Sequence, residues 1–358
     1  MTKRLPDKAF WSDKKVLITG HTGFKGSWLS IWLANLGAQV SGIALSPNTK
    51  PSLFFESGLH ESMDSRFTDI RDERSVVNAV ADLRPDIVFH LAAQPLVIEG
   101  YKDPRGTFDV NTMGLVNVFE AIKLQKSPCI FVVITTDKVY KPSTNQIPHS
   151  EDSPLGATDP YGASKVCAEA ITECYQSLLG LSNGSTVASV RAGNVIGGGD
   201  WAADRLLPDA VRSWRNSTDL IVRSPDSTRP WQHVLEPLAG YLCLVEHLAC
   251  CPSDRGAYNF GPSLKHELSV GDVVNILVEK LSIGVRVTKP DPYLSETEWL
   301  GIESSKAKRI FGFEPIWDAK LAIEKTIAWY ENHANGMSAR RLCLSDIEFF
   351  TNELAYEK

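Results

Sequence analysis

Three kinds of reactive side chain follow one another at the end of an apolar run. The run 132–134, Val-Val-Ile, is typical of a buried strand, and it leads into Thr135, Thr136, Asp137 and Lys138. Hydroxyls, carboxylates and amines are the side chains that move protons and orient polar groups in active sites. A solvated surface ion pair between Asp137 and Lys138 is the alternative, and such pairs contribute little to stability.

Three glycines follow another apolar run at a regular spacing. The stretch GHTGFKG has the pattern G-x-x-G-x-x-G, between a strand-like and a helix-like segment. Glycine permits a tight turn and lets the backbone approach a pyrophosphate, while the helix N-terminus offers free N–H groups and a positive dipole end. In this context the motif predicts dinucleotide binding. The residues expected to bind the cofactor here are Gly20, Thr22, Gly23, Phe24, Lys25 and Gly26.

The end of the second predicted strand does not decide between NAD and NADP. A carboxylate there usually binds the adenosine ribose diol, but this chain has Ser46. A ribose phosphate would favour a nearby arginine, and the nearest cation is Lys50. Asp69 and Ile70 are expected near the adenine, although Asp69 is equally suited to capping the next helix.

A tyrosine and a lysine lie four residues apart in YGASK. This spacing places Tyr161 and Lys165 on one face of a helix. A phenol has a pKa of about 10 and is a poor base at neutral pH. A nearby ammonium and a nicotinamide cation favour the phenolate, so the pair can take a proton from a substrate hydroxyl while a hydride leaves its carbon. A surface pair is the alternative, but the glycine turn and the Thr135–Lys138 strand end favour catalysis.

Strand-like and helix-like segments alternate through the first half of the chain, which predicts a parallel sheet covered by helices on both faces. The expected strands are 14–20, 38–45, 86–93, 129–136 and 186–197. The expected helices are 25–37, 72–85, 109–126 and 161–180. Right-handed crossovers then give a doubly wound, Rossmann-type α/β sheet.

The alternation weakens after residue 196, where proline, tryptophan and arginine become frequent. We therefore predict an NAD-binding Rossmann domain over residues 1–196. Residues 197–358 are expected to form mainly a smaller, substrate-binding α/β domain. A segment at about 230–262 is expected to pack back onto the first domain.

Composition excludes several classes of function. The net charge is -6 with no basic block, so no nucleic-acid partner is expected. No apolar run approaches the roughly 20 residues that span a bilayer, so no membrane association is expected. The charged N-terminal stretch predicts a cytoplasmic protein. The seven cysteines and eight histidines form no Cys-x-x-Cys or His-x-x-x-His pair, so reduced thiols and no metal site are expected.

Several stretches together resemble one family over nearly the whole chain. They are ITGHTGFKGSWL, HLAAQPLV, DVNTMGLVNVFEA, TTDKVY, YGASK and RAGNVIGGGD. The resemblance is to the nucleotide-sugar epimerase/dehydratase branch of the extended short-chain dehydrogenase/reductases. Within it, TTD before Val-Tyr is similar to the sugar 4,6-dehydratases, because epimerases usually lack the acid. The next residue is typically Glu in dTDP- and GDP-sugar dehydratases, whereas Lys138 resembles the branch that acts on CDP-glucose.

The resemblance implies an internal redox cycle on CDP-glucose with NAD as cofactor. Tyr161 would remove the proton of the 4-hydroxyl while hydride passes to NAD, with Thr136 orienting that oxygen and Lys165 assisting. The 4-ketone makes the hydrogen on carbon 5 acidic, Asp137 would protonate the departing 6-hydroxyl, and the hydride would return to carbon 6. Lys138 is either the base at carbon 5, if burial lowers its pKa, or a cation that steadies the enolate. The product would feed deoxysugars of O-antigen and other bacterial surface polysaccharides.

The resemblance also suggests residues around the cofactor and the substrate. Those expected near the cofactor are Leu91, Ala92, Ala93 and Thr135, together with Tyr161 and with Lys165, which can hold the nicotinamide ribose. Those expected to bind the nucleotide sugar are Gln94, Asn194, Arg205, Arg223, Arg229 and Tyr293, since arginine suits a diphosphate. Family members usually form dimers through helices beside the Tyr161 helix, so a homodimer or homotetramer is expected. Another nucleotide sugar, a 4-epimerase or reductase activity, and a non-catalytic NAD sensor remain open alternatives.

Overall fold

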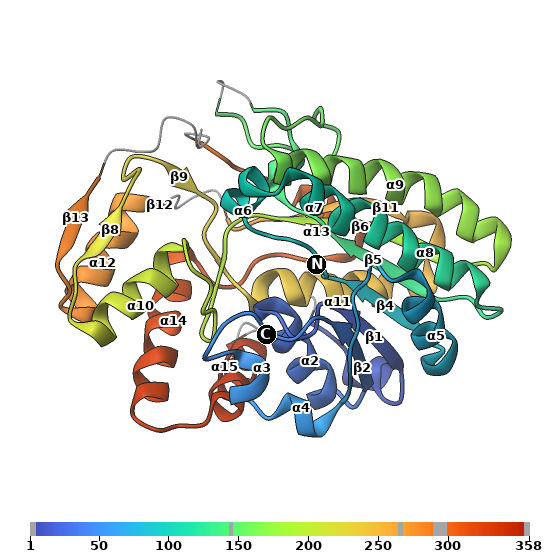
Figure 1. Cartoon of the computed structure of the whole chain (residues 1–358), viewed down its shortest axis with the longest axis horizontal. Helices are drawn as coiled ribbons and strands as arrows, with labels where there is room; N and C mark the ends of the chain where they lie inside the picture. The colour runs from blue at the N-terminus through green and yellow to red at the C-terminus, as the bar shows by residue number, and fades with distance from the viewer. Residues whose placement is uncertain (1–4, 143–145, 264–267, 289–298, 354–358) are drawn as a thin grey trace.

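A parallel sheet forms the centre of the protein (Figure 1). The computed structural model describes residues 5–142, 146–263, 268–288 and 299–353. Within these ranges the central sheet has seven strands in the order β11-β6-β5-β4-β1-β2-β3, all parallel to their neighbours. The strands are β1 (Lys15–Thr19), β2 (Gln39–Ala44), β3 (Asp64–Phe67), β4 (Ile87–His90), β5 (Ile130–Ile134), β6 (Thr186–Ala192) and β11 (Gly256–Phe260).

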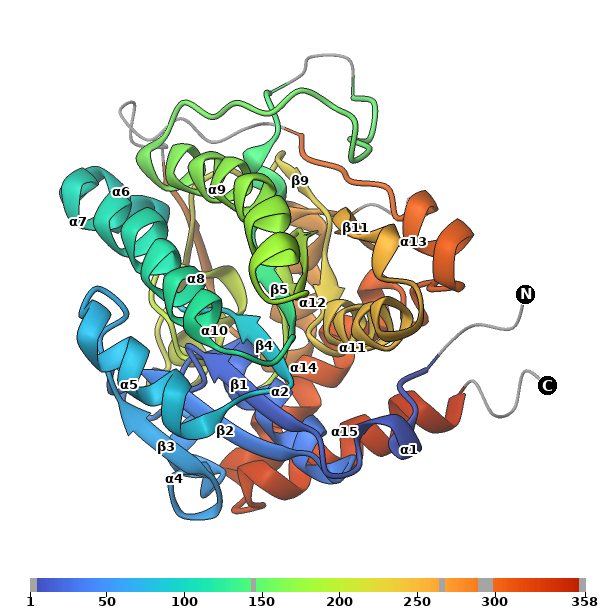
Figure 2. The same cartoon turned by 90° about the vertical axis from the view of Figure 1, so that its right-hand side faces the viewer.

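Successive side chains of a strand enter different cores, as the two-residue period of a strand requires. Val16 and Ile18 of β1 belong to one hydrophobic cluster, while Leu17 between them belongs to another. Helices cover both faces (Figure 2). On one face lie α5 (Glu73–Leu83), α8 (Gly114–Leu124) and α9 (Pro160–Ser182). On the other lie α2 (Phe24–Asn35), α11 (Leu235–Cys250) and α15 (Ala339–Glu353).

A smaller lobe lies to the left in Figure 1 and has a hydrophobic cluster of its own. Its helices are α10 (Leu206–Asn216), α12 (Val270–Leu281) and α14 (Ala319–Ala334). Its strands are β8 (Leu220–Val222) with β13 (Val285–Val287), and β9 (Thr228–Arg229) with β12 (Leu268–Ser269). Between the lobes, β7 (Val195–Ile196) pairs with β10 (Gln232–His233).

The remaining elements are short. They are α1 (Lys8–Trp11), α3 (Leu53–Glu56), α4 (Leu59–Ser62), α6 (Val97–Lys102), α7 (Pro104–Phe108), α13 (Ser305–Phe311), a π-helix η1 (Asp109–Met113) and two 3-10 helices, η2 (Asp137–Val139) and η3 (Pro252–Asp254). No helix in the described ranges combines the length and the apolar character needed to cross a membrane.

The predicted fold class is confirmed by the parallel sheet and its two helical layers. The expected helix 109–126 differs in detail, because its first turn is the π-helix η1, in which Asn111 bonds the backbone of Gln94. The division at residue 196 stays a prediction. The structure shows that β11 pairs with β6, that α11 packs beneath β5 and β6, and that α15 packs against α2.

Candidate active site

The predicted reactive residues meet because they follow neighbouring parallel strands. Thr19 of β1 pairs in register with His90 of β4, and His90 pairs with Val133 of β5. Carboxyl ends of parallel strands lie at one edge of a sheet, where open α/β folds bind their ligands. The glycine turn, residues 91–94 and the Thr135–Lys138 stretch therefore share that edge.

The glycine turn brings a strand end and a helix start into backbone contact. Gly20 has a φ of +79°, and a Cβ on it would lie 2.6 Å from the Ala92 nitrogen. A Cβ on Gly26 would lie 2.2 Å from the Gly20 oxygen. Gly23 is the N-cap of α2 and supplies no capping side chain, so the first N–H groups of the helix stay available to an anion. These features fit the pyrophosphate of a dinucleotide.

We expect Gly26→Ala to destabilise the protein although it sits in a helix, where alanine gains about 1 kcal/mol of propensity over glycine. The added Cβ would meet the Gly20 oxygen at 2.2 Å, and such overpacking costs about 1–3 kcal/mol or more. Gly23→Ala is the matched control, because its Cβ would meet that oxygen at 3.4 Å. Urea denaturation should show the larger loss for Gly26→Ala; equal losses would contradict the contact.

Helix α9 presents Tyr161 and Lys165 to the strand end. Asp159 caps the helix by accepting a hydrogen bond from the Gly162 N–H at 2.9 Å, which fixes where the first turn begins. Both side chains are buried, and Lys165 Nζ donates to the Ile134 carbonyl at 3.1 Å. The lysine is thereby anchored to the end of β5, one turn along the helix from the phenol.

Thr136 and Asp137 lie beside this phenol. The Thr136 hydroxyl donates to Asp137 Oδ1 at 3.0 Å and also lies within hydrogen-bonding reach of the Tyr161 side chain. The other carboxylate oxygen, Asp137 Oδ2, is buried without a protein partner. Burial raises the pKa of Asp137, against the opposing effects of Lys138 and the Thr136 hydrogen bond. A carboxyl group in this setting can hold a proton and present it to a bound hydroxyl.

The protein alone does not make Tyr161 a ready base. Burial raises its pKa to about 12, although Thr136 opposes the rise. Burial also lowers the pKa of Lys165 to about 8, although the Glu169 carboxylate opposes that change. An additional positive charge beside the phenol would lower its pKa, which is what a bound nicotinamide supplies.

Several cations act on Asp137 and its neighbours. The pKa of Lys25, near the start of α2, is lowered to about 8, first by burial and then by the charge of Arg205. The charges of both Arg229 and Lys25 act on Asp137. Arg205 Nη1 lies 2.9 Å from Asp200 Oδ2, which holds that guanidinium in place. Such a cluster suits a ligand with negatively charged phosphates.

The family of the chain follows from two comparisons. The model of the NAD dependent epimerase/dehydratase family matches residues 16–261. A CDP-glucose 4,6-dehydratase from Salmonella typhimurium is 41% identical over 341 residues, which cover 92% of this chain and 94% of that protein. This chain belongs to the NAD-dependent epimerase/dehydratase family. The family resemblance is confirmed, and so is the dependence on NAD that it implied.

Solved structures of similar proteins agree on the fold of this epimerase/dehydratase. A UDP-glucose 4-epimerase from Stenotrophomonas maltophila with bound NAD superposes with a TM-score of 0.78 at 20% sequence identity. The superposition covers 90% of this chain and 100% of the epimerase chain. A dTDP-glucose 4,6-dehydratase from Bacillus anthracis in complex with NAD gives a TM-score of 0.74 at 20% identity, covering 90% and 97%. At these identities the likeness concerns the fold.

The other predicted cofactor residues lie along the same edge of the sheet. Ser46 is exposed two residues after β2, and Ile70 is buried against Gly114 of α8. The Arg71 guanidinium donates two hydrogen bonds to Asp69 Oδ2, from Nε at 3.1 Å and from Nη2 at 2.6 Å. The Asp69 carboxylate is therefore already engaged by a neighbouring side chain. Leu91, Ala92 and Ala93 follow β4 and are partly exposed. The roles of all these residues stay predictions.

The predicted substrate residues differ in how free their side chains are. The Gln94 side-chain amide donates a hydrogen bond to the Thr107 hydroxyl at 2.8 Å, and its oxygen accepts one from the Leu96 N–H at 2.6 Å. These contacts stabilise the loop between β4 and α6, in which Gln94 lies. Asn194 lies between β6 and β7, where its backbone carbonyl accepts a hydrogen bond from the Gln232 N–H at 3.1 Å. 

Two of the predicted arginines also differ in their surroundings. Arg223 follows β8 and pairs with Asp204 at 3.4 Å, whereas Arg229 lies close enough to act on Asp137. Tyr293, another predicted substrate residue, lies outside the described residues. The structure therefore brings Arg205 and Arg229, rather than Arg223, to the Asp137 site.

The sequence analysis missed a buried ion pair that contacts the end of β5 through Thr135. Glu169, four residues after Lys165 on α9, accepts hydrogen bonds from Arg191 Nε at 2.9 Å and Nη2 at 3.0 Å. The Thr135 hydroxyl, predicted to bind the cofactor, donates to the same carboxylate. Spacing was the available signal, because positions 161, 165 and 169 share one helix face.

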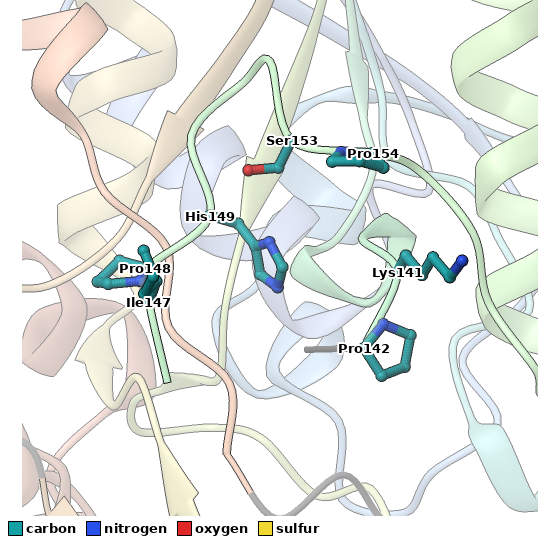
Figure 3. A pocket seen from close by; sticks show the side chains of 7 residues that line it. All are labelled: Lys141, Pro142, Ile147, Pro148, His149, Ser153 and Pro154. Atoms are coloured by element: carbon teal, nitrogen blue, oxygen red, sulfur yellow. The ribbon is translucent and has the colours of Figure 1, made fainter. Parts of the chain in front are cut away.

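A hollow of about 450 Å³ is formed by residues that follow β5 and the 3-10 helix η2 (Figure 3). None of the residues that line it was predicted as a site residue. It is lined by Lys141, Pro142, Ile147, Pro148, His149, Ser153 and Pro154. His149 lies between the proline-rich segments in Figure 3 and stacks on Tyr140 with ring centroids 4.7 Å apart. Tyr140 in turn accepts a hydrogen bond from Arg191, so this wall of the hollow is tied to the buried ion pair.

Proposed function

We propose that this chain is a CDP-glucose 4,6-dehydratase, which converts CDP-glucose to CDP-4-keto-6-deoxyglucose and water. The 41% identity to a curated enzyme of that name, along 92% of the chain, carries the proposal. The buried Thr136–Asp137 pair beside Tyr161 supports it, because a dehydratase needs a proton donor for the leaving hydroxyl in addition to the base at carbon 4. Bound NAD would accept a hydride from carbon 4 and return it to carbon 6, so no external oxidant is consumed.

The chain's own residues then divide the proton transfers. Tyr161 takes the proton of the 4-hydroxyl, with Thr136 orienting that oxygen and Lys165 favouring the phenolate. Asp137, whose pKa is raised by burial, protonates the 6-hydroxyl so that it leaves as water. The unpaired Oδ2 of Asp137 is the oxygen available for that donation. Arg205 and Arg229 bind the diphosphate, and Gly20–Gly26 hold the cofactor pyrophosphate.

Lys138 is the residue whose role is most open to experiment. It is half-buried directly after Asp137, and its charge lowers the pKa of that acid. An ammonium near carbon 5 stabilises the negative charge that forms when the carbon-5 proton leaves. It therefore serves elimination and not the oxidation at carbon 4.

We expect Lys138→Met to keep carbon-4 oxidation and to slow elimination by about 10²-fold, the lower end of the range for groups that assist proton transfer. The side chains have similar length, so the change removes mainly the charge. Single-turnover experiments should show reduced cofactor accumulating without loss of water from the sugar. Lys141→Met, beyond the 3-10 turn, is the control and should behave as wild type. Elimination at the wild-type rate would remove Lys138 from the mechanism.

The function itself is tested by incubating the purified protein and NAD with CDP-, dTDP-, UDP- or GDP-glucose. Mass spectrometry then measures the mass of each product. We expect only CDP-glucose to lose one water at a high rate. With deuterium at carbon 4, the label should reappear on the new methyl group. Label lost to solvent would contradict the internal transfer, and an isomer of unchanged mass would favour a 4-epimerase.

We also propose that the enzyme works in the cytoplasm as a homodimer or homotetramer and feeds deoxysugars of bacterial surface polysaccharides such as O-antigen. No disulfide joins Cys129, Cys167, Cys174, Cys250, Cys251 or Cys343, which supports a reducing compartment. Leu178 and Leu181 on α9 are 43% and 89% exposed, which supports a self-association surface that includes the Tyr161 helix itself. Light scattering in solution tests this; a monomer would contradict it.

A further inference from the structure

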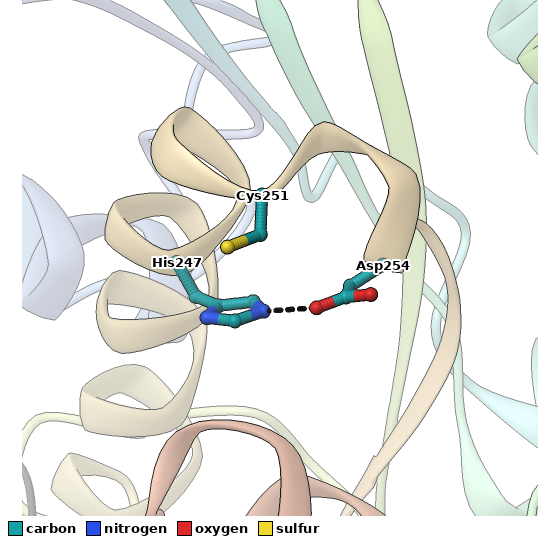
Figure 4. A group of neighbouring side chains, drawn as sticks. All are labelled: His247, Cys251 and Asp254. Carbon is teal, nitrogen blue, oxygen red and sulfur yellow. Dashed lines mark hydrogen bonds and ion pairs between the residues drawn. The ribbon is translucent and has the colours of Figure 1, made fainter.

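A histidine, a cysteine and an aspartate converge where α11 ends (Figure 4). His247 lies in the last turn of α11, Cys251 is the residue directly after it, and Asp254 ends η3. The three side chains come from one eight-residue stretch, His-x-x-x-Cys-x-x-Asp. This mixed spacing is neither a Cys-x-x-Cys nor a His-x-x-x-His pair, so the sequence predicted no metal site.

The donor atoms of these side chains are close together. One imidazole nitrogen, the Cys251 sulfur and one Asp254 oxygen all lie within 4.8 Å of one another. His247 Nε2 and Asp254 Oδ2 are 2.7 Å apart and share a hydrogen bond. In Figure 4 the Cys251 sulfur projects from the helix end toward the imidazole ring. The His247 side chain is 12% exposed and that of Asp254 is 39% exposed, so the group is reachable from solvent.

Neighbouring contacts hold the His247 ring and the backbone of Cys251 and Asp254 in position. The His247 ring stacks on Phe311 of α13 with centroids 5.7 Å apart and planes 30° apart. The backbone carbonyl of Asp254 accepts a hydrogen bond from the Tyr258 hydroxyl. The Cys251 N–H donates to the His247 carbonyl at 2.8 Å, which fixes the turn that brings the thiol back over the helix. Preorganisation of this kind favours metal binding.

We propose that His247, Cys251 and Asp254 bind a zinc ion, with water as the fourth ligand. Imidazole nitrogen, thiolate sulfur and carboxylate oxygen are the ligand types of Zn²⁺, whereas Mg²⁺ and Ca²⁺ prefer oxygen alone. Ligand atoms in a tetrahedral zinc site lie roughly 3.5 Å from one another. Donor atoms that lie up to 4.8 Å apart therefore need to approach by about 1 Å, whereas His247 Nε2 and Asp254 Oδ2, now 2.7 Å apart, need to separate by slightly less than that. Rotation of the partly exposed side chains provides both movements. Binding replaces the proton shared by His247 and Asp254 and releases the thiol proton.

The position of this site separates it from the catalytic residues. Helix α11 packs on one face of the central sheet and leads through η3 into β11, which is parallel to β6. The loop from α11 to β11 therefore lies at the amino edge of the sheet, opposite the edge that carries Asp137 and Tyr161. A metal ion there would join the end of α11 to the turn before β11 without touching the substrate.

Titration of tag-free, metal-free full-length protein with Co²⁺ tests the proposal, because a cobalt–thiolate bond gives an absorption band that carboxylates and imidazoles do not. We expect one equivalent of Co²⁺ to produce the band and Zn²⁺ to abolish it by displacement. Cys251→Ser should remove the band, and Asp254→Asn should weaken binding by roughly tenfold or more. Cys250→Ser is the matched control, since the adjacent exposed thiol is not part of the group.

Several outcomes would overturn the site. A band that survives in Cys251→Ser, or that disappears in Cys250→Ser, would place the metal elsewhere. If no band appears at Co²⁺ concentrations well above that of the protein, these residues do not bind the metal. His247 and Asp254 would then form only their hydrogen bond. Circular dichroism of each variant establishes that it is folded, and Asp254→Asn supplies a second measurement should Cys251→Ser fail to fold. Dehydratase activity is expected to stay unchanged in all these variants.

Discussion

Asp137→Asn should retain oxidation at carbon 4 and lose elimination of water by about 10³–10⁴-fold, the upper part of the range for general acid catalysis. Asparagine keeps the size of the side chain and an acceptor for the Thr136 hydroxyl, which now donates to Oδ1 at 3.0 Å. It cannot deliver a proton to the 6-hydroxyl. Mass spectrometry of the sugar, together with absorbance of the reduced cofactor, separates the two steps.

The pH dependence provides an independent check on Asp137. Burial raises the pKa of this carboxyl group in the protein. Elimination requires its protonated form, so the rate should be highest below the raised pKa and fall as pH increases through it. Asp137→Asn should lose that descending limb while its residual rate stays flat.

Asp82→Asn is the matched control for this variant, because Asp82 is a surface carboxylate with a side chain 68% exposed. It should leave both the rate and the pH profile unchanged. An Asp137→Asn enzyme that eliminates water at even a tenth of the wild-type rate would assign the proton to another group.

Local patterns were sufficient to predict that a buried strand ends at the polar Thr135–Lys138 stretch and that Tyr161 begins a helix. The spacing of Tyr161 and Lys165 follows from helix geometry, and the glycine turn follows from the sterics of a strand that meets a helix. Both features depend on neighbours within a few residues. The alternation of strands and helices likewise predicted the parallel sheet, because each strand of such a sheet is apolar on both faces.

Contacts between distant segments were not predictable in the same way. The segment at about 230–262 was expected to pack back onto the first domain, but nothing local indicates that its strand β11 pairs with β6, or that α15 packs on α2. The approach of Lys25 to Asp137 depends on how the turn before α2 faces the end of β5, across two strand spacings. The partner of Glu169 lies 22 residues away on β6, and no periodicity within α9 reveals it.

The Glu169–Arg191 pair is the most completely buried ion pair among those in the described ranges, with both side chains 5% exposed. Hydrogen bonds from Thr135 and from Ser189, at 2.7 Å, complete the shell of the carboxylate. On the other side, Arg191 Nη1 donates to the Tyr140 hydroxyl at 2.8 Å. The network thus joins α9, β6 and both ends of the Thr135–Tyr140 stretch that carries Asp137.

Removing one partner of such a pair leaves a charge buried and uncompensated, which costs about 3–5 kcal/mol. We therefore expect Arg191→Met to lower the free energy of unfolding by that amount, measured by urea denaturation at neutral pH. Arg66→Met is the control, since Arg66 pairs with exposed Asp64 and Asp82 and should cost about 1 kcal/mol or less. Arg191→Met combined with Glu169→Leu should recover much of the loss, because it removes both charges.

The sign of the pH effect distinguishes this account from simple loss of packing. In the wild type, burial alone would raise the pKa of Glu169, but the hydrogen bonds and charge of Arg191 outweigh it and the pKa is lowered. The pair therefore stabilises the fold above the unfolded pKa of about 4.3, and that stability is lost as pH falls through the lower folded pKa. Without Arg191 the burial effect dominates, so the Arg191→Met deficit should shrink as pH falls and Glu169 takes up a proton. A deficit independent of pH would show that Arg191 contributes by packing, not by charge.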